Sequence, residues 1–417
     1  MKKFLTTVIA AAFTLILTTL CTFAESVGFS TESEAIVAAQ TPFDKKYISI
    51  DWNTSQSETV GVPMTYKDFV LIPTLNKVNM LSEKDGEITA TIEFDEKVSE
   101  NSRGAVIGDT LIQPTRTKLY TVDLNTMSII NTKTYGDIVT DIAVADQLVY
   151  FGFKYKDKYK FLCVDMSKEF EIVWEYDSDV PVTSPASIGG MIIFGAGDKL
   201  IVRTENGFTE NAVQAEITHI FAGEYAVFMS CKNGELRKLR LDENGKTEED
   251  SLMSCEIGGT LTAPSGIDNH IYVGSTEGFF VIDGLNMEIM KSFDELKNAS
   301  APLITTGNGV RAYTAAPHSD SDGDCWYLYS ILDTDETQTV SELAKIIDFT
   351  NGKVTVSQSG KMFFRDAYGR VWAASETKPN VFVNVLKIVL IIAIFVMILL
   401  ILRTWAKRRQ EKKPPEY

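Results

Sequence analysis

The sequence predicts an all-β fold, a β-propeller of about eight four-stranded blades that an N-terminal strand closes. Three observations predict it: a unit of short strands recurs about every 40 residues, each unit contains a strand hairpin, and a lone strand-like segment precedes the first unit. We therefore expect one ring domain over residues 47–375.

The hairpin of the repeat is clearest in DNHIYVGSTEGFFVID, residues 268–283. A turn residue leads into an apolar strand, a polar turn follows, and a second strand ends in Asp. We interpret Gly274 and Gly278 as turn glycines of one blade, because a positive φ costs glycine little. Units of this form begin near residues 68, 109, 146, 190, 224, 268, 309 and 360.

Two further strands complete each unit and match the four strands of a propeller blade. The first precedes the hairpin and often opens with proline, as at Pro63, Pro185, Pro264 and Pro302. The last follows the hairpin, as after Glu87 and Glu171. The final unit is one strand short, and the segment YISIDW at 47–52 has no partner. We predict that this segment completes the last blade and closes the ring, which removes exposed sheet edges.

The N-terminus has the features of a secretory signal peptide in residues 1–24. A basic start precedes an apolar stretch with small residues near its end, so cleavage is expected after Ala24. Cys21 allows a lipoprotein interpretation, but Leu20 before it is bulky where lipoprotein signals have a small residue. Residues 25–46 are expected to be a flexible leader.

The C-terminus predicts a transmembrane helix over residues 381–402. Lys387 is near enough to the outer end of this helix to reach the headgroups. A buried core helix is the alternative, but the basic tail of residues 403–417 favours a membrane span with a cytoplasmic tail. Residues 376–380 form a short linker. We therefore expect a single-pass protein of the cell membrane with its propeller outside the cytoplasm.

Charge and cysteine content limit the possible functions. The formal net charge is −16 although the tail is basic, so the propeller is acidic and nucleic-acid binding is disfavoured. Four cysteines follow the signal peptide, and their spacing indicates neither a zinc site nor a thioredoxin-like centre. Disulfides and buried free thiols both remain open for Cys163, Cys231, Cys255 and Cys325.

The repeat resembles the pyrroloquinoline-quinone-like, or quinoprotein-like, propeller family. The match is closest in HIYVGSTEGFFVID at 270–283 and is also present in YGRVWAAS at 368–375. That family contains quinone-dependent dehydrogenases and a non-catalytic outer-membrane assembly lipoprotein. The resemblance to the enzymes stops after the hairpin, because neither Asp123 nor Asp283 is followed by the Thr-Gly and Trp of their repeats. Adjacent cysteines are also missing, so the chain resembles the non-catalytic branch more, and no cofactor residue is assigned.

Few residues indicate chemistry. The three histidines, His219, His270 and His318, lie in different predicted blades, and sequence alone does not bring them together. Asp320, Asp322 and Asp324 alternate as calcium ligands do, but Cys325 and Ile331 replace the Gly and Glu that an EF-hand loop requires. We assign no catalytic, cofactor-binding or metal residue, and calcium binding at this hairpin stays an alternative.

The sequence therefore predicts a binding or scaffold module for a protein or a cell-surface polymer, with no evident catalysis. Two alternatives remain. One is a quinone-dependent oxidoreductase with a divergent site. The other is a single-pass sensor that signals through its cytoplasmic tail.

Overall fold

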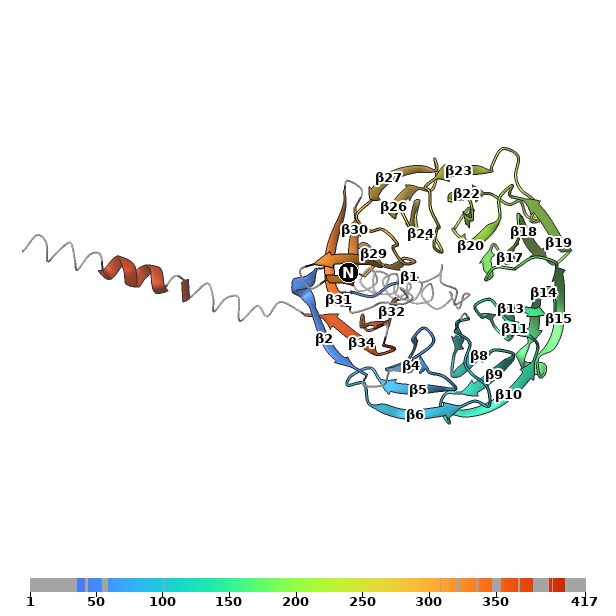
Figure 1. Cartoon of the computed structure of the whole chain (residues 1–417), viewed down its shortest axis with the longest axis horizontal. Coiled ribbons are helices and arrows are strands. Elements are labelled where there is room, and N and C mark those ends of the chain that lie inside the picture. The colour runs from blue at the N-terminus through green and yellow to red at the C-terminus, as the bar shows by residue number, and fades with distance from the viewer. Residues whose placement is uncertain are drawn as a thin grey trace, which may run out of the picture. The chain divides into compact units, whose positions relative to one another are not determined.

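The computed structural model describes residues 36–41, 44–54, 59–100, 102–307, 309–320, 323–334, 337–346, 354–366, 368–377, 390–391 and 393–401. The chain divides into two compact units, Met1–Glu376 and Thr377–Tyr417. The described strands of the first unit form eight sheets, and Figure 1 shows these sheets as the blades of a ring. The predicted eight-bladed all-β propeller is confirmed.

Blades 1 to 4 follow one another along the chain, each with antiparallel neighbours. Their strands, from the inside outward, are β3 (Met64–Tyr66), β4 (Phe69–Pro73), β5 (Lys77–Ser82) and β6 (Ile88–Glu93) in blade 1; β7 (Ala105–Ile107), β8 (Thr110–Pro114), β9 (Lys118–Asp123) and β10 (Ser128–Thr134) in blade 2; β12 (Ala143–Ala145), β13 (Leu148–Tyr155), β14 (Lys158–Asp165) and β15 (Glu171–Ser178), with β11 (Asp137–Ile138) beside β13, in blade 3; and β16 (Ala186–Ile188), β17 (Met191–Ala196), β18 (Lys199–Thr204) and β19 (Gly207–Ala212) in blade 4.

Blades 5 to 8 continue the pattern, and strands from the N-terminal region join the last two. The strands are β20 (Ile217–Ala222), β21 (Val227–Cys231), β22 (Glu235–Leu239) and β23 (Met253–Glu256) in blade 5; β24 (Ser265–Ile267), β25 (His270–Ser275), β26 (Gly278–Asp283) and β27 (Glu288–Phe293) in blade 6; β1 (Ile36–Val37), β28 (Leu303–Thr305), β29 (Val310–Asp320), β30 (Gly323–Asp333) and β31 (Gln338–Ile346) in blade 7; and β32 (Val354–Val356), β33 (Met362–Arg365), β34 (Val371–Glu376) and β2 (Ile48–Asn53) in blade 8. Short 3-10 helices cover Lys45–Tyr47 (η2) and Met166–Lys168 (η3).

The core of the ring lies between the blades. Eight clusters of buried apolar side chains occur among the described residues, one at each seam between neighbouring blades. The middle strands are covered on both faces, so β4 and β8 are almost continuously buried, whereas the outer strand β6 is mostly exposed. This explains why the middle strands read as unbroken apolar runs.

Closure of the ring occurs as predicted. Strand β2 pairs antiparallel with β34, from Ile48 opposite Glu376 to Asn53 opposite Trp372. It therefore supplies the outer strand of blade 8, although more than 300 residues separate the two strands in sequence. An irregularity between Ile50 and Trp52 shifts the register, as a β-bulge does.

Part of the predicted flexible leader, residues 25–46, is structured. Strand β1 pairs in parallel with β28, and Thr41 is fully buried. The signal peptide predicted for residues 1–24 lies outside the described residues.

Little of the predicted membrane segment is described. Only residues 390–391 and 393–401 of the predicted span 381–402 are described, and they are helical. Within the described part of the chain, no helix has both the length and the apolar character that a membrane span requires. The basic tail of residues 403–417 lies outside the described residues.

Candidate binding site

Hydrogen bonds join three loops that lead into the inner strands of neighbouring blades. The backbone N–H of Arg103, before β7, donates to Asp141 Oδ1 at 2.6 Å. The N–H of Asp141, before β12, donates to Ser184 Oγ at 3.0 Å, in the loop before β16. We call Arg103, Asp141 and Ser184 the axial cluster. It places one cation and one carboxyl group at the inner end of blades 2 to 4.

Burial sets the electrostatics of the axial cluster. Asp141 is 4% exposed, and burial raises the pKa of its carboxyl group to about 6, while the N–H and the charge of Arg103 act in the opposite direction. Burial also lowers the pKa of Arg103. Arg103 is partly exposed as a residue, but its Nε is buried and has no hydrogen-bond partner among the described residues.

We expect Asp141→Asn to change how stability depends on pH. A raised pKa means that the folded chain holds the proton more tightly than the unfolded chain. The natural chain therefore loses on the order of 2 kcal/mol of stability as pH rises from about 4 to 6. Asparagine keeps the acceptor for the Arg103 N–H but does not titrate. The free energy of unfolding of the variant, measured relative to the natural chain, should therefore be higher at pH 7 than at pH 4.

Urea unfolding at pH 4 and pH 7 measures this difference. Asp157→Asn, on an exposed turn, is the matched control and should leave the pH dependence unchanged. His219 contributes with the opposite sign, because burial lowers its pKa to about 4, but this contribution is common to all three chains. Identical pH profiles for the natural chain and Asp141→Asn would contradict the prediction.

A second polar cluster spans the seam between blades 6 and 7. Asp333 at the end of β30 has a side chain that is only 1% exposed. Its Oδ2 contacts His270 Nδ1 at 2.6 Å and accepts a short hydrogen bond from the Tyr272 hydroxyl. Its Oδ1 accepts from Gln338 Nε2 at 2.8 Å. The buried carboxyl group of Asp333 is thus held by several partners. Two of them face solvent in part: His270, whose side chain is 27% exposed, and Gln338.

A hydroxyl clamp recurs at the start of the blades, and the sequence analysis missed it. A Thr or Ser hydroxyl before the inner strand accepts from a backbone N–H in the second strand. The pairs are Thr140 with Gly152, Thr183 with Gly195, Thr262 with Gly274, and Ser300 with Ala315, at 2.7 to 3.1 Å. The recurrence of Thr or Ser just ahead of the strands that open with Pro185, Pro264 and Pro302 is the signal that could have revealed it.

The backbone conformation and surroundings of Gly274 and Gly278 correct their interpretation as turn glycines. Neither residue adopts a positive φ. A Cβ on Gly274 would lie 2.6 Å from the carbonyl oxygens of both Ala299 and Ser300, in the segment that leads into blade 7. A Cβ on Gly278 would lie 2.8 Å from the Phe293 carbonyl oxygen. Both glycines are therefore required by close backbone approach, not by the turn.

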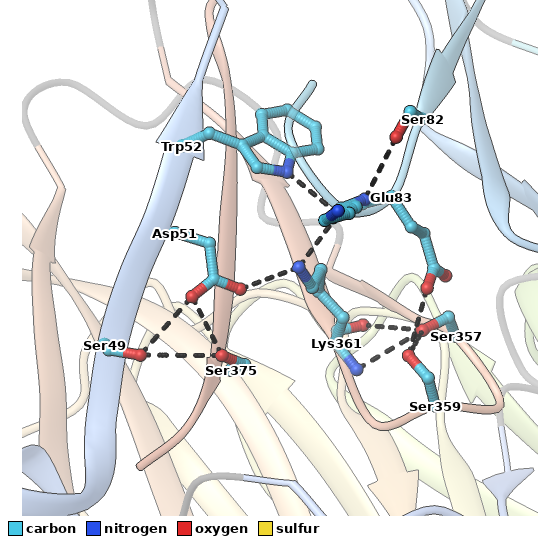
Figure 2. A network of polar contacts seen from close by, with 10 residues as sticks. Ser49, Asp51, Trp52, Ser82, Glu83, Ser357, Ser359, Lys361 and Ser375 are labelled. Atoms are coloured by element: carbon cyan, nitrogen blue, oxygen red, sulfur yellow. Dashed lines mark hydrogen bonds and ion pairs between the residues drawn. The ribbon is translucent and has the colours of Figure 1, made fainter. Parts of the chain in front are cut away.

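A third polar network joins the closing strand to blades 8 and 1 (Figure 2). Lys361 Nζ, before β33, contacts Asp51 Oδ2 of β2 at 2.8 Å and donates to the Glu83 carbonyl oxygen of blade 1 at 2.8 Å. Trp52 Nε1 donates to the same carbonyl oxygen at 2.9 Å. A cavity of about 150 Å³ near this seam has mixed polar and apolar walls that include Asn53, Thr74 and Leu81. This volume is below the range of about 300 to 1,000 Å³ typical of ligand pockets.

The structure does not gather the three histidines. They lie in blades 5, 6 and 7, and their ring nitrogens contact Thr218, Asp333 and Tyr329. Within the described residues, none of them forms a Ser-His-Asp arrangement.

The structure decides the open question about the cysteines. Cys163, Cys231 and Cys255 are free and buried, and Cys325 is a buried thiol. Burial raises the pKa of Cys163 to about 12 and that of Cys231 to about 11, so neither thiol is a reactive nucleophile.

The calcium alternative is not tested. Asp322 and the side chains of Asp320 and Asp324 lie outside the described part of the structure. The described residues contain no group of three or more His, Cys, Asp or Glu side chains placed to hold a metal ion.

Comparison with known proteins supports the fold. No family model matches the sequence, and no curated protein is significantly similar to it. The crystal structure of BamB from Moraxella catarrhalis superposes with a TM-score of 0.59 at 13% identity, over 79% of this chain and 99% of that chain. A europium-containing methanol dehydrogenase superposes with a TM-score of 0.61 at 8% identity, over 84% of this chain and 98% of that chain. The chain therefore shares the β-propeller fold of these two proteins.

Proposed function

We propose that this chain is a binding or scaffold module that holds a protein partner through its propeller. The fold likeness to BamB supports this function, together with the resemblance of the repeat to the non-catalytic branch of the family. We further propose that a signal peptide at 1–24 exports the propeller and that residues 381–402 anchor it to the cell membrane. The sequence supports both of these proposals.

Exposed apolar residues on blades 2 and 3 are the observation that supports a protein partner. Ile129 and Ile130 of β10 are 41% and 61% exposed, and Ile172 and Val173 of β15 are 46% and 51% exposed. We call these four residues the apolar rim. Lys133 Nζ donates to the Phe170 carbonyl oxygen at 2.9 Å and holds the two blades together beside it.

A break in the strand pairing explains why consecutive apolar residues are exposed. Ile130 and Val173 each fall at a register shift in the pairing of the outer strand. A bulge redirects side chains and often marks a binding edge. Exposed apolar residues on two adjacent blades are typical of a surface that a protein covers.

Crosslinking and copurification of the full-length chain test the proposed function. We expect a reproducible protein partner, and we expect Ile130→Asp with Val173→Asp to reduce its recovery at least tenfold. Met290→Asp is the matched control, because Met290 is 41% exposed at the same register shift in blade 6. Equal recovery with the rim variant would exclude the rim as the binding surface.

Quinone-dependent oxidation is the second candidate, because one similar structure is a methanol dehydrogenase. The described residues do not assemble the carboxylate cluster that would hold a metal beside such a cofactor. Addition of pyrroloquinoline quinone and calcium to the purified chain, followed by absorption spectroscopy, would reveal a bound chromophore if this candidate were correct.

A sensor function is the remaining alternative and depends on the tail of residues 403–417. Loss of the cellular response when this tail is deleted would support it, and an unchanged response would argue against it.

A further inference from the structure

The N-terminal segment of residues 36–41 lies against the inner strands of blades 7 and 8. Strand β1 pairs in parallel with β28, with Ile36 opposite Ile304 and Val37 opposite Thr305. Figure 1 shows β1 inside the ring. The chain then passes the Gly307 N–H, which donates to the Ala39 carbonyl oxygen at 3.2 Å. The segment thus pairs with the inner edge of blade 7, and among the described strands no other blade has a partner at its inner edge.

The inner strands of blades 7 and 8 are more completely buried than those of the other blades. All described residues of β28 and β32 are buried. Each of the other six inner strands keeps at least one partly exposed residue: Thr65, Ile107, Ala145, Ile188, His219 or Ile267. Ala39 is 4% exposed and belongs to the apolar cluster shared by blades 7 and 8. The difference in burial fits a segment that fills a site on these two blades.

Two glycines make room for the backbone of the segment. A Cβ on Gly307 would overlap the backbone of Ala39 and Gln40, and a Cβ on Gly360 would overlap the Gln40 carbonyl group. Gly360 also has φ +87°, a conformation that favours glycine. The site is therefore shaped for a polypeptide backbone with a small side chain at the position of Ala39.

A hydroxyl contact fixes the end of the segment. Thr41 Oγ1 lies 3.0 Å from Thr305 Oγ1 and hydrogen-bonds the Tyr313 hydroxyl. All three residues are fully buried, so the pocket for this hydroxyl excludes water. A bound peptide with a hydroxyl two residues after the small side chain would keep both of these contacts.

The described ladder of β1 is shorter than that of the closing strand. Strand β1 has two residues in its ladder, whereas β2 has six residues and an ion pair between Asp51 and Lys361. Parallel pairing is slightly less stable per residue than antiparallel pairing, and proteins often recognise an extended peptide by adding it to a free sheet edge.

We propose that the inner face of blades 7 and 8 is a binding site for an extended polypeptide segment of a partner, and that residues 36–41 are its occupant in cis. The partner segment runs parallel to β28, with a small residue at the place of Ala39 and a Ser or Thr at the place of Thr41. The inference rests on the proposed binding function and names the partner's chemistry.

A labelled peptide of residues 33–41, SEAIVAAQT, tests this site by fluorescence polarisation. The host is the full-length chain in which Ala39→Glu expels the segment, because a charged side chain does not fit the buried position. We expect the peptide to bind this variant at least tenfold more tightly than the natural chain. Adding Gly307→Val to the variant should abolish binding, and a peptide with Val in place of Thr41 should bind more weakly.

A second variant closes the site and serves as the reverse control. The Thr41 and Thr305 hydroxyls are near enough for Thr41→Cys with Thr305→Cys to form a disulfide. This disulfide would hold the segment in the site, so the oxidised chain should not bind the peptide. Equal peptide binding by all chains, or no binding to a folded Ala39→Glu variant, would overturn the inference. If that variant still recovers the protein partner but not the peptide, the proposed binding function stands and this inference fails.

Discussion

Replacing Gly274 by alanine is expected to lower the free energy of unfolding by about 3 kcal/mol. The added Cβ would meet the carbonyl oxygens of Ala299 and Ser300 at 2.6 Å. The backbone has little freedom to move away, because the Gly274 N–H donates to Thr262 Oγ1 at 3.1 Å and its carbonyl oxygen accepts from Thr262 N–H at 2.9 Å. The substitution therefore pushes blade 6 away from blade 7.

Gly108→Ala is the control that separates close approach from backbone conformation. Gly108 has φ +54°, and nothing lies within 4 Å of the Cβ that alanine would add. Gly108→Ala should therefore lower the free energy of unfolding only by the cost of placing alanine in a left-handed backbone conformation, about 1 kcal/mol. Urea unfolding of both variants measures the difference. A loss for Gly274→Ala no larger than that for Gly108→Ala would show that the seam adapts to the extra atom.

The ring was predictable because its blades repeat one sequence pattern. Its closure was predictable because one strand-like segment had no partner in the sequence. The hairpin pattern recurs in every blade, and the segment at 47–52 was a strand without a partner. The role of Gly274 was missed because a glycine beside a turn has the same sequence pattern whether the turn or a neighbouring backbone requires it. Comparison with Gly152 and Gly195, which take the same place in blades 3 and 4, would have separated the two explanations.

The contacts that form the candidate sites were not predictable, because they cross between blades. Arg103 and Asp141 lie 38 positions apart, and His270 and Asp333 lie 63 apart, in segments that only the ring brings together. Residues 36–41 carry no turn or strand signal beyond a short apolar stretch. Their pairing with β28 depends on the glycines at 307 and 360, which the sequence alone does not connect to them.

The closing strand gives the second large expected effect: Trp52→Ala should lower the free energy of unfolding by about 3 kcal/mol. Trp52 packs against Phe363 of blade 8 with ring centroids 5.9 Å apart, and its indole lies over Gly86 of blade 1. Its Nε1 donates to the Glu83 carbonyl oxygen, which Lys361 also binds (Figure 2). One side chain thus joins the closing strand to both blades at the seam.

Trp52→Ala should also free the closing strand before the rest of the ring unfolds. The blades are joined mainly through their seams, so a weakened seam opens locally, and limited proteolysis should cut the variant ahead of β3 well below its unfolding midpoint. Tyr225→Ala is the matched control, because Tyr225 is 72% exposed and its hydroxyl bonds only the neighbouring Glu224 among the described residues. The control should unfold and resist protease as the natural chain does. If Trp52→Ala matched this control in both measurements, ring closure would depend on the β2 ladder with β34 and not on the aromatic contact at the seam.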